Sequence, residues 1–332
     1  MKLNRNIKIF INYFLGPLLF IWLSWSIYRE IINQPDLTIA WQKISESFSS
    51  PMLWNLVAVV LLMFINWSVE AIKWKISVNE IQKVSFSRAL KAVLSGVSFS
   101  VSTPNRVGEY LGRVLYMDEG NRLKTISVTI AGSISQLIIT LLMGLTGLII
   151  LRPAIEAEHF VSPIWLTMII YGVLAVLLVL TLFYFRLSWL IKWIDRLPGM
   201  KRFTYLVRVL EDFNATLLLR ILSLSLLRFF IFGIQYYLLF RFFDVDVSWW
   251  QAFWTVSVSF VVMAVIPTFA IAELGLRGKV SLIFTGLFSA NKAGIIFTTA
   301  GIWFINLIIP AIVGSLMILS IKKIYTEKNE GI

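Results

Sequence analysis

The sequence has no cysteine, and His159 is its one histidine among 332 residues. Without cysteine the chain can form no disulfide, no thiolate metal site and no cysteine nucleophile. A single histidine cannot build a zinc site unless carboxylates stand beside it. We therefore expect neither a bound metal nor a cofactor.

Charged residues are also scarce. Asp, Glu, Lys and Arg make up 14% of the chain, whereas 58% is hydrophobic and the mean hydropathy is +0.81. A soluble globular protein cannot bury that much apolar surface. Crossing a hydrocarbon core of ~30 Å takes about 20 helical residues, and uncharged runs of that length recur along the chain. The composition excludes a soluble enzyme and predicts an all-α integral membrane protein.

Six runs are long enough to cross a bilayer. The first, 9–28, follows three basic residues but lacks a small-residue cleavage site, so we interpret it as a retained span and not as a signal peptide. The others are 52–69, 126–151, 160–185, about 215–240 and 293–321. We expect one membrane domain over residues 1–325 and a short cytoplasmic tail at 326–332.

Two further apolar stretches are broken at a proline. The first, 92–105, would make about 21 Å of helix, which is too short to cross, and it ends around Pro104. The second, 249–272, contains Pro267 and is followed by a short run at 280–290. A bilayer tolerates a broken helix only where protein or a wet cavity covers the backbone. We interpret each region as a re-entrant hairpin of two half-helices, with paired crossings as the alternative.

Positive charge collects on alternate loops. Bases concentrate at 73–91, 122–124, 186–208 and 322–328, whereas the loops between them are poor in bases. The positive-inside rule explains the net charge of +12 without any nucleic-acid partner. We expect a multi-pass protein of a bacterial plasma membrane, with both termini cytoplasmic. Residues 188–214 predict two interfacial amphipathic helices on that side.

The two prolines lie 163 residues apart, about half the chain. At this offset Val84, Ser85, Ala89 and Val93 match Val247, Ser248, Ala252 and Val256. With the predicted topology, this match indicates an inverted repeat formed by about 52–151 and about 215–321, with 160–185 as the connecting span. Inverted repeats with paired broken helices are typical of transporters.

The first hairpin tip carries features of an anion site. Thr103 can cap a half-helix that starts at Pro104, and Arg106 adds a cation to the positive end of the helix dipole. Glu109 and Arg113 follow at a four-residue spacing on one helical face. We expect a phosphate-bearing headgroup to bind at this tip, at Thr103, Pro104, Asn105, Arg106, Gly108, Glu109 and Arg113.

The second tip repeats the acid and the base. Glu273 and Arg277 follow Pro267, but nothing there corresponds to Arg106. Ionisable groups at membrane depth cost about 2.5–3.5 kcal/mol or more, which favours a substrate-binding role for all three residues of this tip. The alternative is that each Glu–Arg pair only stabilises its own helix.

Three more charged residues lie in predicted spans. Arg228 is deep in the fifth span and needs a partner, for which Glu109, Glu273 or a lipid phosphate are the candidates. We include Arg228 among the substrate-binding residues. Glu70 and Lys73, at the inner end of the second span, are interpreted as an interfacial pair whose lysine snorkels to the headgroups.

Four segments together carry a family resemblance. They are Ala-Ile-Lys-Trp-Lys at 71–75, Val-Ser-Phe at 84–86, Thr-Pro-Asn-Arg-Val-Gly-Glu at 103–109 and Ile-Pro-(x)5-Glu at 266–273. Over roughly residues 5–325 the chain resembles the flippase-like transmembrane family of lysylphosphatidylglycerol synthase. It departs from the family's glycine-rich second motif, because Thr268, Phe269 and Ala270 follow the proline.

The resemblance implies a membrane unit that moves phospholipids or lipid-linked molecules between leaflets. In the fused synthases a separate soluble domain makes the lysyl-lipid, and since the sequence ends at Ile332 we expect the membrane unit without that domain. No phosphate-binding loop ending in Lys-Ser/Thr is present, so ATP is not the expected energy source.

We therefore predict a transporter that flips an anionic lipid by alternating access and has membrane lipids as its partners. The alternatives are a membrane-embedded glycosyl- or phosphotransferase acting on a lipid phosphate, and a non-catalytic partner of an envelope-lipid complex. The sequence leaves open whether copies of the chain form a homo-oligomer.

Overall fold

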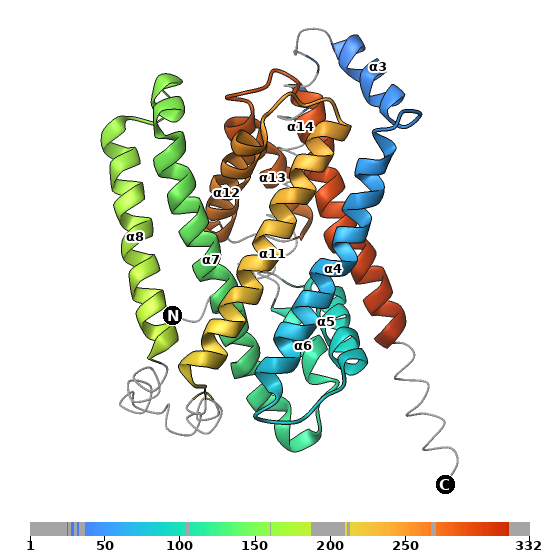
Figure 1. The fold of residues 1–332 in the computed structure, drawn as a ribbon, viewed down its shortest axis with the longest axis vertical. Coiled ribbons are helices and arrows are strands. Elements are labelled where there is room, and N and C mark those ends of the chain that lie inside the picture. The colour runs from blue at the N-terminus through green and yellow to red at the C-terminus, as the bar shows by residue number, and fades with distance from the viewer. Residues whose placement is uncertain are drawn as a thin grey trace, which may run out of the picture.

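The computed structural model describes residues 25, 28, 29, 32, 37–101, 103, 107–159, 161–186, 210, 213–266 and 270–318. Within these residues every regular element is a helix (Figure 1). In chain order they are α3 (Leu37–Ser47), α4 (Leu53–Val78), α5 (Phe86–Val101), α6 (Gly108–Val114), η3 (Glu119–Asn121), α7 (Arg122–Ala157), α8 (Pro163–Phe185), α11 (Ala215–Phe242), α12 (Trp249–Val265), α13 (Ala270–Thr285), α14 (Lys292–Trp303) and the π-helix η6 (Phe304–Ile308). The predicted span 9–28 and the predicted interfacial helices at 188–214 lie largely outside the described residues.

Five of these helical segments are long and apolar enough to cross a membrane. They are α4, α7 together with η3, α8, α11, and the helix that runs from α14 through η6 to Ile318. The prediction of a multi-pass all-α membrane protein is confirmed. The second span extends beyond the predicted 52–69 to Val78, so its charged end lies inside the helix and not in a loop.

Two pairs of shorter helices occupy opposite halves of the bundle. In Figure 1, α5 and α6 lie in the lower half and α12 and α13 in the upper half. The ends of the first pair come together where Arg88 bonds to the Tyr116 carbonyl at 2.6 Å, and the ends of the second where Thr285 bonds to Thr255 at 3.4 Å. Each pair is therefore a hairpin of helices shorter than the five candidate spans, with 16 residues in α5, 17 in α12 and 16 in α13.

A serine side chain caps the first helix of each hairpin. Ser85 Oγ accepts a hydrogen bond from the Arg88 amide at 3.2 Å, just before α5. Ser248 and Gln251 form a reciprocal capping box at the start of α12. The predicted serine at the start of each half-helix is thus confirmed. The helix after the first break, however, begins at Gly108 and not at the predicted Pro104.

Close packing in the first hairpin depends on two glycines. A Cβ added to Gly112 of α6 would lie 2.4 Å from Gly96 Cα of α5, and one added to Gly96 would lie 2.7 Å from the Glu109 carbonyl oxygen. Small residues allow two helix backbones to approach this closely inside a membrane protein. The contact holds α6, and the charged side chains on it, against α5.

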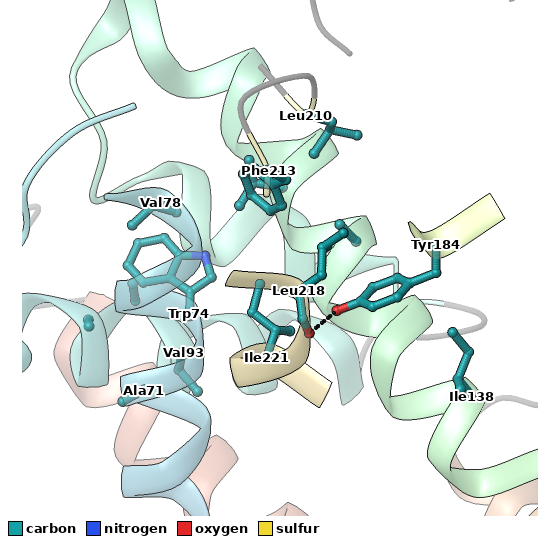
Figure 2. Packing of buried hydrophobic residues seen from close by; sticks show 14 of the residues in the cluster. Ala71, Trp74, Val78, Val93, Ile138, Tyr184, Leu210, Phe213, Leu218 and Ile221 are labelled. Carbon is teal, nitrogen blue, oxygen red and sulfur yellow. Dashed lines mark hydrogen bonds between the residues drawn. The ribbon is translucent and has the colours of Figure 1, made fainter. Parts of the chain in front are cut away.

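A buried apolar cluster fixes α4 beside α11. Figure 2 shows Ala71 and Trp74 of α4 near Leu218 and Ile221 of α11, all fully or almost fully buried. The Tyr184 hydroxyl of α8 donates to the Leu218 carbonyl at 3.0 Å. This packing places Asn66 and Glu70 of α4 opposite Arg228, which lies two turns after Ile221 on α11.

Candidate functional site

The two hairpins line one cavity of about 650 Å³. The first hairpin contributes Val97, Ser100 and Glu109, and the second contributes Glu273 and Arg277 among others. Residues of α4, α7, α11, α14 and η6 complete the wall. Glu109 of the first hairpin and Glu273 of the second therefore line the same cavity, whereas Pro104 and Pro267 lie outside the described residues.

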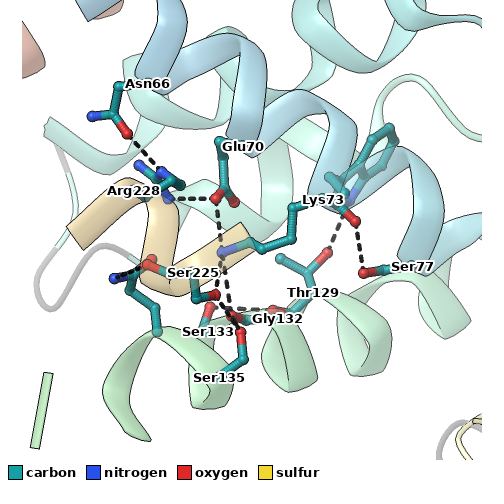
Figure 3. Close-up of polar contacts among 12 residues, drawn as sticks. Asn66, Glu70, Lys73, Ser77, Thr129, Gly132, Ser133, Ser135, Ser225 and Arg228 are labelled. Atoms are coloured by element: carbon teal, nitrogen blue, oxygen red, sulfur yellow. Dashed lines mark hydrogen bonds and ion pairs between the residues drawn. The ribbon is translucent and has the colours of Figure 1, made fainter. Parts of the chain in front are cut away.

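Glu70 of α4 is the centre of the charged wall and is only 3% exposed. Its Oε1 accepts from Arg113 Nη2 at 2.9 Å, and its Oε2 lies 2.8 Å from Lys73 Nζ. Oε2 also accepts from Arg228 Nη1 of α11, as Figure 3 shows. One carboxylate thus compensates three cations that come from three helices. Because the charges are desolvated, removing Glu70 would take away the carboxylate that these three cations share.

Further contacts fix the two cations nearest Glu70. Lys73 Nζ lies 3.4 Å from Ser225 Oγ and 3.5 Å from the Gly132 carbonyl oxygen. Arg228 Nε donates to Asn66 Oδ1 at 2.8 Å, and its guanidinium lies 5.5 Å from the centre of the Trp67 ring. These donors find their acceptors inside the protein and not in water or headgroups (Figure 3).

Two predictions about these residues are therefore wrong. Lys73 does not snorkel, because α7 and α11 supply acceptors at the depth where it lies, and it is only 2% exposed. Arg228 pairs with Glu70, and not with Glu109 or Glu273. We call Glu70 and its partners Lys73, Arg113 and Arg228 the charged hub, and a signal for this hub is present in the sequence. Asn66, Glu70 and Lys73 recur at spacings of four and three on one helical face, and hydrophobic residues continue to Val78.

The first-hairpin pair is joined to the same hub. Arg113 Nη2 contacts both Glu109 Oε1 and Glu70 Oε1, so one guanidinium bridges the α6 and α4 carboxylates. Glu109 lines the cavity, whereas Arg113 is buried behind it. The predicted four-residue pair is confirmed, and its arginine has an additional partner that the spacing alone did not predict.

Thr103 fixes the start of α6. Its Oγ1 accepts from the Gly108 amide at 2.7 Å and donates to the Phe99 carbonyl at 3.2 Å. The predicted capping role is thus kept, with Gly108 as the first residue of the helix. Pro104, Asn105 and Arg106 lie outside the described residues, as does Pro267.

The second-hairpin pair lies on α13, and its arginine also hydrogen-bonds Tyr236 of α11. Arg277 Nε donates to Glu273 Oε1 at 2.9 Å, and the guanidinium lies 6.0 Å from the centre of the Phe260 ring. Both charged residues line the cavity. Arg277 thus presents a cation to the cavity beside an aromatic wall.

The cavity wall combines charge with apolar surface. The charged residues that line it are three carboxylates, Glu70, Glu109 and Glu273, and three cations, Lys73, Arg228 and Arg277, and the buried Arg113 behind them adds a fourth cation. Apolar side chains complete the lining, including Leu137, Phe229, Phe232, Phe260, Met263 and Leu307. In the part of the chain that the structure describes, no group of three or more His, Cys, Asp or Glu could hold a metal.

The comparisons with known proteins identify a family. The family model described as the lysylphosphatidylglycerol synthase TM region matches residues 13–314, which include every helix of the cavity wall. No match was found among individually curated proteins. Because the match covers most of the sequence, this chain is a multi-pass membrane protein that belongs to the lysylphosphatidylglycerol synthase transmembrane-region family.

Proposed function

We propose that this chain moves a phospholipid or another anionic lipid-linked molecule between the two leaflets. The observation that carries the proposal is the composition of the cavity. Buried ionisable groups stand on one part of its wall and phenylalanine, leucine and methionine side chains on another. An anionic lipid is amphipathic in the same way, since its headgroup needs cations and its chains need apolar contacts.

The charge arrangement suits a reversible anion site. Each of the four cations Lys73, Arg113, Arg228 and Arg277 has a carboxylate partner, so the empty site carries no large electrostatic penalty. A phosphate can take the place of a carboxylate at an arginine, because the guanidinium binds both groups through the same fork of donors. Arg228 and Arg277, which line the cavity, are the proposed phosphate ligands, with Arg113 behind Glu109.

The paired hairpins support alternating access. Each brings a Glu–(x)3–Arg pair to the same cavity from an opposite half of the bundle (Figure 1). In the proposed mechanism the halves form an inverted repeat, and rocking of one half against the other opens the cavity to each side in turn. The tip residues Thr103, Pro104, Asn105, Arg106, Gly108 and Pro267 stay predicted headgroup-binding residues in this mechanism.

Charge at the two ends of the bundle supports a cytoplasmic orientation for the α5–α6 end. At that end bases outnumber acids, with Lys83, Arg88, Lys91, Arg122, Lys124 and Arg186 against Glu80, Asp118 and Glu119. At the opposite end acids outnumber bases, with Glu46, Glu156, Glu158, Asp244 and Asp246 against Lys43, Arg152, Arg241 and Lys292. By the positive-inside rule, the α5–α6 end faces the cytoplasm, and so would both termini in a bacterial plasma membrane.

The test is lipid transfer by the purified protein in vesicles. A headgroup-labelled anionic lipid, with an impermeant quencher outside, reports how much lipid crosses between leaflets. We expect transfer with the unchanged protein, and at least about a tenfold loss with Glu273→Gln/Arg277→Gln, which removes both charges of one pair and so leaves neither uncompensated. The matched control is Glu119→Gln/Arg122→Gln, an exposed pair at the end of the bundle.

The same vesicles separate the alternatives. An enzyme acting on a lipid phosphate would convert the supplied lipid into a product of new mass, seen by mass spectrometry of the extracted lipids. A non-catalytic partner of a lipid-synthesis complex would give neither transfer nor product. Either result with folded protein would overturn the transporter proposal.

A further inference from the structure

One region of the cavity wall is polar but uncharged. Asn306 of η6 is only 6% exposed and lines the cavity, and its side-chain Oδ1 has no hydrogen-bond partner among the described residues. The indole N–H groups of Trp67 and Trp303, on the same wall, also lack a partner there. Gln136 Oε1, elsewhere in the lining, is unpartnered among the described residues as well. Buried polar groups are nearly always hydrogen-bonded, so several such groups at one cavity indicate that it binds a polar ligand.

The three groups lie in one part of the cavity wall. Trp67 of α4 and Trp303 at the end of α14 both pack against a small buried cluster of Val97, Leu307 and Ala311. Asn306 follows Trp303 by three residues. Trp67 also lies under the guanidinium of Arg228, so this neutral region adjoins the charged hub.

The backbone is unusual at this position. Residues Phe304–Ile308 form a π-helix, and the Ile309 amide donates to the Phe304 carbonyl, five residues earlier. Single π turns inside α-helices are rare and frequently occur at functional sites. Here the π turn contains Asn306 and directly follows Trp303, so the irregular backbone coincides with the unpartnered groups.

We propose that Trp67, Trp303 and Asn306 form a subsite for the hydroxyl groups of the transported headgroup. The inference rests on the proposed function and narrows its substrate to anionic lipids with a polyhydroxylated headgroup. The subsite offers two N–H donors and one carbonyl acceptor, and a hydroxyl group can both accept from an indole and donate to an amide oxygen. A phosphate can only accept and an ammonium can only donate, so neither satisfies all three groups. The phosphate itself occupies the adjoining cations.

Two headgroups share this chemistry, a cyclic polyol such as inositol and a linear one such as glycerol. The experiment compares the transfer of phosphatidylinositol and phosphatidylglycerol with that of phosphatidic acid, which has no polyol, and phosphatidylmethanol, whose methyl-capped phosphate has no hydroxyl group. We expect at least about a tenfold preference for one or both polyol lipids, because a site built to bond a hydroxyl rejects a ligand that lacks it. Whichever of the two polyol lipids is transferred faster identifies the polyol that the subsite binds.

Variants of the subsite then separate it from the charged hub. Asn306→Leu, Trp303→Phe and Trp67→Phe should lose the preference for polyol lipids while phosphatidic acid is still transferred. The tryptophan changes keep an aromatic ring, so they test the N–H group if Asn306→Leu fails to fold. Trp254→Phe is the matched control, because Trp254 also has a buried, unpartnered N–H but does not line the cavity.

Three results decide the matter. Equal transfer of all four anionic lipids by the unchanged protein would overturn the subsite but leave the transporter proposal standing. A preference that survives in all three variants would also overturn the subsite. Absence of transfer for every lipid would remove the proposed function itself, and with it the inference that rests on it.

Discussion

The two hairpins carry the same four-residue acid–base spacing but use it differently. In the first, Arg113 is buried and contacts both Glu109 of its own helix and Glu70 of α4. In the second, Arg277 pairs with Glu273 of its own helix, hydrogen-bonds the neutral Tyr236 of α11 and lies beside an aromatic ring. The first hairpin is therefore anchored to the bundle through a second carboxylate, whereas the ion pair of the second stays within α13 and lines the cavity.

The difference shows that spacing along a helix predicts a pair but not its role. A four-residue spacing places two side chains on one face, and this holds in both hairpins. Whether the arginine also reaches a second carboxylate depends on which helix packs against it. In the first hairpin that neighbour is α4, which presents Glu70. We expect the two pairs to respond differently to mutation, as follows.

The largest effect is expected at the hub. Glu70→Gln removes the carboxylate shared by Lys73, Arg113 and Arg228, and breaking a buried ion pair in this way costs about 3–5 kcal/mol. We expect a large fall in the thermal unfolding temperature of the detergent-purified protein. The control is Glu46→Gln, which changes an exposed carboxylate of α3. An unchanged unfolding temperature in Glu70→Gln would show that the hub does not anchor the first hairpin.

The glycine contact of the first hairpin should come next. Gly112→Ala places a Cβ 2.4 Å from Gly96 Cα, and because both atoms are held by backbone, rotation of a side chain cannot relieve the clash. Overpacking of this kind costs about 1–3 kcal/mol. Gly172→Ala in α8 is the matched helical control, since nothing lies within 4 Å of its Cβ position. Thermal unfolding of the two variants measures the difference, and equal values would contradict the close contact.

Lysine replacements compare the two arginines directly. Arg113→Lys cannot keep contact with two carboxylates in the geometry of a guanidinium, and losing one hydrogen bond to a charged group costs about 1.5–3 kcal/mol. Arg277→Lys keeps its one carboxylate partner and puts at risk only the hydrogen bond with the neutral Tyr236 hydroxyl, so we expect a smaller loss, of about 1 kcal/mol. The comparison uses unfolding in mixed micelles with increasing denaturing detergent. If Arg277→Lys proved the more damaging, the second pair would not be the local one.

The smallest effect is expected at an ion pair outside the membrane. The exposed Lys43 of α3 lies 2.8 Å from Asp244, and its hydrogen bond with Asp244 raises the Lys43 pKa above the usual 10.5. A folded-state pKa above the unfolded one stabilises the protein below pH 10.5, and this contribution is lost as the pH rises through the folded pKa.

Because the pair is exposed, Lys43→Gln should change the unfolding temperature only slightly at neutral pH. The small difference from the unchanged protein should disappear at strongly alkaline pH. A difference that grows with pH would have the wrong sign and would exclude this pair as its source.

The sequence by itself determined the membrane class, five of the six predicted spans and the two broken hairpins. These follow from local features of the sequence. The length of an apolar run predicts a span, a proline predicts a break in a helix, and a serine that can cap the next helix predicts where that helix starts. The Glu–(x)3–Arg pairs were predictable for the same reason. The span at 9–28 and the proline tips stay predictions, because they lie outside the described residues.

Only the tertiary structure decided which charges meet. Glu70 and Arg228 are 158 residues apart, and no local pattern joins them. Their contact follows from the apolar packing of α4 on α11. Lys73 has the sequence context of a snorkelling lysine, yet it is buried because α7 and α11 supply its acceptors. Local spacing fixes which residues share a helical face, but the environment of that face depends on helices distant in the sequence.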